Sequence, residues 1–257
     1  LFMTLHYSIG RLPAQPMATR RADARIGHFN TSVADFSDDL ERSPRRRYVE
    51  RWRLEKKDPG AALSEPVQPI TFWIDRTVPQ KYRAPITAGV LEWNKAFERI
   101  GFKDAIVVRI EPDDAAFDTL DFGRASIRWM TNAAPAWGAI GPRHVDPRSG
   151  EILDADIAIE SLSSRSIRTL RSQVLASAAG VDEPGSADLA SGLVCTYADA
   201  AAEQMSYALD VLEARGEIDP DSPQAREFVD AYLKDTAMHE VGHALGLRHN
   251  FRASRAY

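Results

Sequence analysis

Three histidines fall close together near the end of the 257-residue sequence, at His239, His243 and His249. Residues four apart on an α-helix lie on the same face and about 6 Å apart along the axis, so the first two imidazoles can bind one metal ion. Imidazole nitrogens are common ligands of Zn²⁺, at distances of about 2.0–2.1 Å. The spacing therefore predicts a zinc site on a helix, with His239 and His243 as two of its ligands.

His249 cannot join the other two histidines on an unbroken helix, because ten residues of helix would carry it about 15 Å along the axis. Gly246 offers a place for the helix to end, since glycine adopts the left-handed conformation after a helix at little cost. We therefore expect the helix to stop near Gly246 and the chain to reverse, which makes His249 the third metal ligand.

Glu240 directly follows the first of these histidines. Three imidazoles leave a fourth zinc position for a water molecule, whose pKa zinc lowers to about 7. A glutamate on the same helix can take the proton of that water as general base and pass it to a leaving amine. The pattern predicts zinc-dependent hydrolysis of peptide bonds, with Glu240 as the catalytic base. A purely structural zinc site would need a fourth protein ligand, and none is evident nearby in the sequence.

The elements that must position these residues can be predicted from hydrophobic periodicity and from helix and turn signals. Strands are expected where β-branched and aromatic residues alternate or run together, at 5–9, 48–54, 70–74, 105–110, 125–130 and 153–160. Helices are expected at 86–100, 161–179 and 199–215, with a loop at 180–192. A long helix from Pro223 to about Leu245, with Ser222 as its N-cap, would carry the histidines.

Composition and charge narrow the class of protein. The content of 44% hydrophobic residues is enough for one large domain or two small ones, and the single cysteine, Cys195, excludes an internal disulfide framework. The net charge of −5 argues against a dedicated nucleic-acid binder, and no apolar run is long enough to span a membrane. Residues 1–60 are basic, with 12 Lys and Arg against 8 Asp and Glu. The run Arg45–Arg47 is typical of a solvated face rather than of a binding patch.

The segment from His239 to His249 resembles the extended zinc motif of the metzincin metallopeptidases, HExxHxxGxxH, with every defining position present. The wider sequence is similar to a bacterial metzincin-like family of secreted or envelope-associated proteins, over most of residues 20–254. The similarity is carried by Arg51–Lys56, Pro69–Asp75, Trp93–Phe97, Val145–Asp156 and His239–Phe251. These segments indicate the family without naming a substrate.

The resemblance implies an α+β fold, the upper subdomain of a metzincin, in which helices back a twisted mixed sheet and the last helix carries the zinc ligands. We expect residues 1–65 to form a β-leaning lead-in, which could add a sheet or shield the cleft. Residues 66–257 would form the catalytic upper subdomain, with a helical insertion at about 161–222. Metzincins also have an antiparallel edge strand that pairs with extended substrate. Leu153–Glu160 is the best candidate for it, although its alternation equally suits an internal strand.

Metzincins carry a methionine-containing turn beneath the zinc, downstream of the third histidine. The five methionines of this sequence all precede that histidine: Met3, Met17, Met130, Met205 and Met238. We therefore expect the methionine turn and the lower subdomain to lie beyond Tyr257, and residues 1–257 to have weak activity or none by themselves.

The favoured function is a zinc endopeptidase, secreted or located in the cell envelope or periplasm, although the sequence shows no signal peptide. It would bind Zn²⁺ through His239, His243 and His249 and act on peptide or protein substrates. The alternative is a catalytically inactive peptidase-like module that binds peptides or protein partners. The intact Glu240 favours the enzyme. His144 could supply a fourth ligand, but an ordinary loop histidine is the simpler interpretation.

Overall fold

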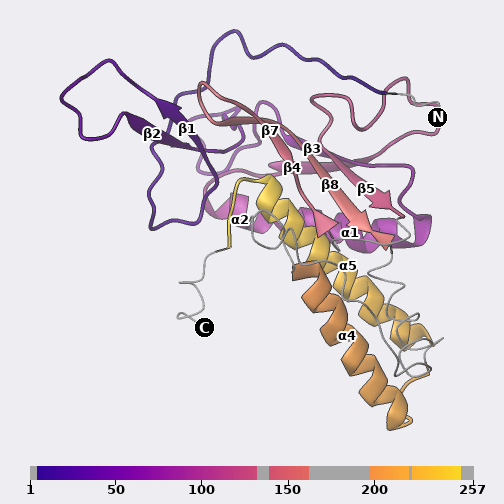
Figure 1. Cartoon of the computed structure of the whole chain (residues 1–257). Helices are drawn as coiled ribbons and strands as arrows, with labels where there is room; N and C mark the ends of the chain where they lie inside the picture. Colours follow the sequence, from indigo (N-terminus) through magenta and orange to yellow (C-terminus); the bar gives the residue numbers. More distant parts are fainter. Residues whose placement is uncertain (1–4, 132–138, 162–196, 220–221, 250–257) are drawn as a thin grey trace.

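The structure is a computed structural model that describes residues 5–131, 139–161, 197–219 and 222–249. Its strands are β1 (Asn30–Ala34), β2 (Arg45–Val49), β3 (Ile70–Ile74), β4 (Ile106–Ile110), β5 (Ser126–Met130), β6 (Ala139–Ile140), β7 (Arg143–Asp146) and β8 (Glu151–Glu160). Its helices are α1 (Gln80–Leu91), α2 (Asn94–Arg99), α4 (Tyr197–Ala214) and α5 (Pro223–Ala244). Helices and a mixed sheet occur together, which confirms the predicted α+β fold (Figure 1).

The main sheet combines parallel and antiparallel pairs. Within the described part of the chain its strand order is β4-β3-β5-β8-β6, and β7 also pairs with β8. The pairs β3–β4, β3–β5 and β5–β8 are parallel, whereas β6 and β7 run antiparallel to β8. The prediction that Leu153–Glu160 is an edge strand is therefore wrong. This segment is β8, which hydrogen-bonds on both sides because β6 and β7 cover the edge that β5 leaves open.

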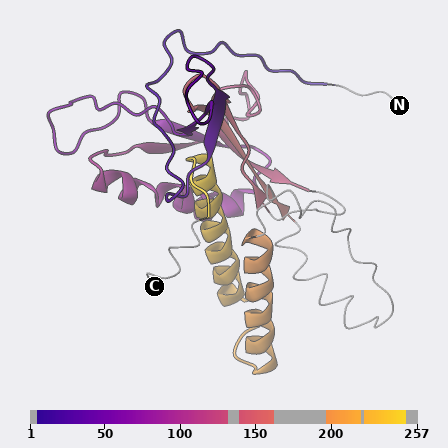
Figure 2. The ribbon, with the colours of Figure 1, turned by 60° about the vertical axis from the view of Figure 1, so that its left-hand side comes forward.

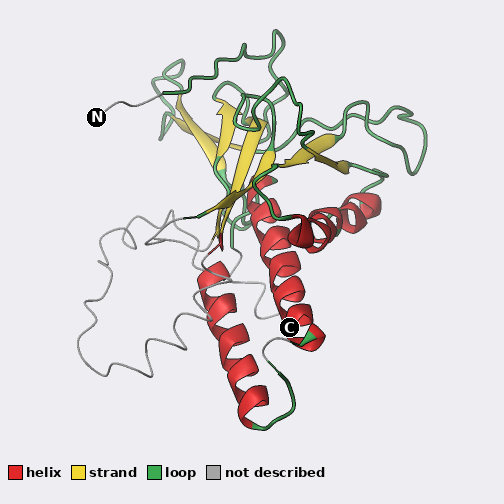
Figure 3. Ribbon diagram, turned by 90° about the vertical axis from the view of Figure 1, so that its right-hand side faces the viewer, coloured by secondary structure: helices red, strands yellow, loops and turns green. Residues whose placement is uncertain are grey.

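Helices α1 and α5 lie along one face of this sheet, and α4 packs beside α5 and extends away from the sheet (Figures 1 and 3). The side chains between sheet and helices have no exposed surface. They include Phe72, Ile74, Ile127, Ile157 and Ile159 from the sheet, Ile86 and Val90 from α1, and Leu233 and Val241 from α5. Burial of this apolar surface is the main force that fixes α5 on the sheet.

The helix after β3 begins at Gln80, earlier than the predicted start at Ile86. Pro85 therefore lies inside α1, where it removes one helical hydrogen bond. Close packing against α5 favours the helix in spite of this loss. A Cβ atom at Gly89 would lie 2.2 Å from the carbonyl oxygen of Lys234, so the two helices touch backbone to backbone at this glycine.

Of the other helices and strands predicted from the sequence, some are confirmed and some are wrong. The strand expected at 5–9 is absent, and its apolar side chains are exposed because no neighbouring strand covers them. The strand expected at 48–54 is shifted to β2, and the helix expected over 86–100 is divided into α1 and α2. The helices expected at 199–215 and from Pro223 are confirmed as α4 and α5. Two further predictions lie outside the described residues, the helix at 161–179 and the loop at 180–192, and so does Cys195.

The N-terminal part of the chain packs against the end of α5. Strands β1 and β2 form a separate two-stranded antiparallel sheet that lies near this helix end (Figure 2). The backbone N–H of Phe29 donates to the carbonyl oxygen of Gly246 (2.8 Å), and the N–H of Arg248 donates to that of Gly27 (2.9 Å). The indole N–H of Trp52 donates to the carbonyl oxygen of Ala244 (2.9 Å), one of the acceptors that a helix end leaves unpaired.

Helix α5 ends in a left-handed glycine turn. Gly246 has a φ of +98°, and its N–H donates to the carbonyl oxygen of His243 (2.9 Å). The N–H of Leu247 donates to the carbonyl oxygen of Gly242 (3.0 Å), which completes the two hydrogen bonds of a Schellman motif. A Cβ atom at Gly246 would lie 2.2 Å from the carbonyl oxygen of Glu50, so both the backbone angle and the available space require glycine.

We predict that Gly246→Ala lowers the free energy of unfolding by at least about 2 kcal/mol, because it adds a steric clash with Glu50 to the cost of a positive φ. Denaturant unfolding measures the loss. Gly123→Ala is the control, since Gly123 also has a positive φ (+84°) but no atom within 4 Å of the added Cβ. Equal losses in the two variants would show that the contact with Glu50 is unimportant.

Candidate metal centre

Helix α5 positions two of the three histidines. The hydroxyl of Ser222 accepts a hydrogen bond from the backbone N–H of Ala225 (3.2 Å), so the predicted N-cap is confirmed. The helix continues to Ala244 and carries His239 and His243 one turn apart, with their ring centroids separated by 4.8 Å. Packing of α5 against α1 and against the sheet fixes the helix, whose geometry presents both imidazoles on one side.

The reversal at Gly246 brings His249 back to the other two histidines, as the sequence predicts. The Nε2 atoms of His239 and His249 lie 3.0 Å apart, and one nitrogen from each of the three rings lies within 4.8 Å of the others. Two nitrogens that bind one zinc ion at 2.0–2.1 Å in a tetrahedron are about 3.3–3.4 Å apart. The donor set therefore fits a zinc ion, and the spacing of His239 and His249 is close to the one that zinc requires.

Neighbouring backbone and side-chain groups contact the imidazoles and restrict their orientation. The Nδ1 atom of His243 lies 2.8 Å from the carbonyl oxygen of Leu247, to which it donates when this nitrogen carries the proton, and its Nε2 is then the nitrogen available to a metal. The ring of Tyr197 stacks on His239 with a centroid distance of 3.9 Å, and its hydroxyl donates to Asp235. Phe29 contacts His243 edge-on, at 5.9 Å between centroids.

An ion pair between the half-buried Arg143 and the buried Glu50 lies against Phe29. The Nε of Arg143 donates to a carboxylate oxygen of Glu50 at 2.6 Å, and the hydroxyl of Thr31 donates to the other oxygen at 3.2 Å. The guanidinium of Arg143 lies 3.6 Å from the centroid of the Phe29 ring, which is close enough for a cation–π contact. Sequence reasoning missed Phe29, Glu50, Arg143 and Tyr197, because none lies near the motif in the chain and no local pattern marks them.

The electrostatic environment favours neutral imidazoles. Burial, together with the neighbouring His243 and His249, lowers the pKa of His239 to about 4. Burial also lowers the pKa of His243, against the hydrogen bond to Leu247, which raises it. Neutral imidazole is the form that binds a metal ion, so these two rings are in a ligand-competent state near pH 7.

Glu240 is completely buried, and neither of its carboxylate oxygens has a hydrogen-bond partner among the described residues. Burial raises the pKa of Glu240 to about 7. A buried carboxyl group without a partner is costly, so Glu240 is suited to a contact beyond those that the described residues supply. Gly141, the residue after β6, lies against this carboxylate, and an added Cβ there would be 3.5 Å from Oε2. Sequence reasoning also missed this glycine.

Two hollows open at the histidine group: the smaller is lined by all three histidines and the larger by His249 alone of the three, and Arg248 lines both. One has a volume of about 420 Å³ and contains the apolar side chains of Trp93, Met238 and Leu247. The other has a volume of about 930 Å³ and is lined mainly by polar residues from the N-terminal part of the chain and from β2. The histidine group is therefore accessible from an apolar side and from a polar side.

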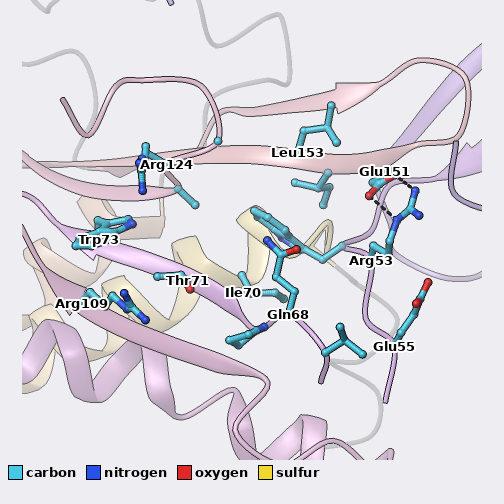
Figure 4. Close-up of a pocket in the computed structure, with 16 residues that line it drawn as sticks. Arg53, Glu55, Gln68, Ile70, Thr71, Trp73, Arg109, Arg124, Glu151 and Leu153 are labelled. Atoms are coloured by element: carbon cyan, nitrogen blue, oxygen red, sulfur yellow. Dashed lines mark hydrogen bonds and ion pairs between the residues drawn. The ribbon is translucent and has the colours of Figure 1, made fainter. Parts of the chain in front are cut away.

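A third hollow, of about 520 Å³, contains none of the three histidines. Figure 4 shows Trp73, Arg109 and Arg124 at one end of it and the ion pair of Arg53 with Glu151 (2.6 Å) at the other. It has no group of metal-ligating side chains and is not part of the candidate centre.

His144 lies on β7 with its side chain exposed, in register with Asp154 on β8. The described part of the chain contains one group of potential metal ligands, and His144 is not a member of it. The structure therefore gives no support to a fourth ligand from His144.

The fold and the site together define a candidate metallohydrolase, and comparisons with known families agree with this class. Residues 221–257 match the family described as Met-zincin, which covers α5 and the three histidines. Residues 1–57 match a family described as a domain of unknown function (DUF5117). No curated protein and no solved structure matches the chain. Within the described residues, no helix has the length and apolar character needed to cross a membrane.

We predict that the protein binds one zinc ion per chain and that His249→Ala weakens this binding at least about tenfold, because one of three ligands is lost. Competition with a chromophoric chelator measures the affinity, and elemental analysis gives the stoichiometry. His144→Ala is the matched control and is expected to keep wild-type affinity. Unchanged affinity in His249→Ala would show that this histidine is not a ligand.

Proposed function

We propose that this protein is a zinc-dependent metalloendopeptidase with His239, His243 and His249 as metal ligands and Glu240 as general base. One observation carries the proposal: three imidazoles converge on one point beside a buried carboxylate that has no hydrogen-bond partner among the described residues. The match of residues 221–257 to the Met-zincin family supports the same chemistry.

A zinc ion, when bound, would act as a Lewis acid on the scissile carbonyl and would lower the pKa of the attacking water. The three imidazoles would hold the ion and, as neutral ligands, leave its positive charge uncompensated. Glu240 would accept a proton from the attacking water and return it to the leaving amine. Its burial keeps bulk water away from the carboxylate, so that a water molecule in the site is its available partner.

Substrate binding can be inferred from the edge of the sheet. Strand β6 pairs with β8 on one side, and its other side has no partner strand among the described residues. Gly141, the residue after β6, lies against Glu240. An extended peptide that added to β6 as a further strand would therefore run past the carboxylate, and its backbone hydrogen bonds would tolerate many sequences.

We predict that Glu240→Ala lowers kcat/KM about 10²–10⁴-fold in the full-length protein, because the general base is removed. Cleavage of a broad peptide library, followed by mass spectrometry, identifies substrates for this measurement. Glu227→Ala is the control, since Glu227 is an exposed glutamate on the same helix. Zinc content should remain unchanged in both variants, and a chelator should abolish the wild-type activity.

Undiminished cleavage by Glu240→Ala would exclude Glu240 as the base. If the zinc-loaded wild type cleaves no peptide in the library, the alternative of a catalytically inactive peptide-binding module replaces the enzyme.

A further inference from the structure

The larger hollow beside His249 is formed mainly by arginine-rich segments. Residues 20–30, strand β2 and the pair Arg248–His249 supply most of its wall. Seven arginines line it, against the two carboxylates of Asp23 and Glu41. A cavity with this composition carries a strong positive potential, in a chain whose net charge is −5.

Most of the positive charge in the hollow is not compensated. Asp23 forms an ion pair with Arg25 (2.6 Å), and Glu41 forms one with Arg46 (2.7 Å), so both carboxylates are already used. The remaining arginines form no ion pair with any residue that the structure describes. They are Arg20, Arg21, Arg45, Arg47 and Arg248.

The hollow places this charge beside His249, which lines the same cavity. Arg45 and Arg47 occupy alternate positions of β2, so both exposed side chains project from the same face of the strand. Arg248 is exposed and directly precedes His249, and the backbone hydrogen bond between Arg248 and Gly27 joins the two walls of the hollow. An anionic group bound here would lie next to the third histidine.

We propose that this arginine-lined hollow binds acidic side chains of a peptide substrate, and that the protein prefers peptides with aspartate or glutamate near the scissile bond. The proposal rests on the proposed function, since it assigns a substrate class to the same site. Arginine forms short, bidentate, charge-assisted hydrogen bonds with carboxylates. Several uncompensated guanidinium groups also raise the local concentration of anions.

Peptide binding can be measured without turnover in the zinc-loaded full-length Glu240→Ala variant. The probes are a fluorescent peptide rich in glutamate and the same peptide with glutamine at those positions. Fluorescence anisotropy should show at least about tenfold tighter binding of the glutamate peptide, with a difference that shrinks as salt is added. Adding Arg45→Glu and Arg47→Glu should remove this preference, whereas Arg45→Lys and Arg47→Lys should keep most of it.

The matched control changes the same net charge elsewhere, with Arg99→Glu and Arg109→Glu, two exposed arginines outside the hollow. It should keep the preference. An equal loss in this control, or an unchanged preference after the substitutions on β2, would overturn the proposal. Tighter binding of a single-stranded oligonucleotide than of the glutamate peptide would also overturn it.

The test separates this inference from the proposed function. If the wild type cleaves no peptide but the glutamate preference depends on β2, the proposed function fails and the acidic-peptide site stands. If the wild type cleaves the two peptides with equal kcat/KM and binds them equally, the enzyme stands and the acidic-peptide site fails.

Discussion

The left-handed turn at Gly246 determines whether three imidazoles or only two can share one ion. Helix α5 can present His239 and His243 on one face by its own geometry, but His249 reaches them because the chain reverses immediately after the helix. The reversal is held from outside the helix. The carbonyl oxygen of Glu50 occupies the space that a side chain at position 246 would need, and Phe29 bonds to the carbonyl oxygen of the glycine itself.

The sequence was sufficient to predict the parts of the centre that depend on local geometry. The spacing of His239, Glu240 and His243 requires only a helix, and Gly246 is the residue type that ends one, so the convergence of the rings followed from the motif. The aromatic and charged residues around the rings could not be predicted, because Phe29, Tyr197 and Arg143 reach the site through tertiary packing.

Dependence on tertiary packing also explains the errors in the predicted fold. Alternation of apolar residues in Leu153–Glu160 shows which side chains face the core, but it contains no information about neighbours in the sheet, so it did not distinguish an edge strand from an internal one. The helix expected from Ile86 begins earlier, at Gln80, with Pro85 inside it, and the packing of Gly89 against the backbone of α5 is a tertiary contact that the local sequence does not show. Composition favoured a solvated face for the basic run Arg45–Arg47, and it could not predict the hollow that the run lines, since one wall of that hollow comes from residues about 200 positions later.

The hydrogen bond between Trp52 and Ala244 joins residues 192 positions apart, and it has a consequence for biosynthesis. A ribosome releases the N-terminal part of this chain long before it releases the helix end to which that part binds. Until then the indole N–H of Trp52 and the backbone groups of Gly27 and Phe29 lack their final partners, and long-range closures of this kind are slow. The convergence of the three imidazoles therefore matures late, after residues 27–52 have met the end of α5.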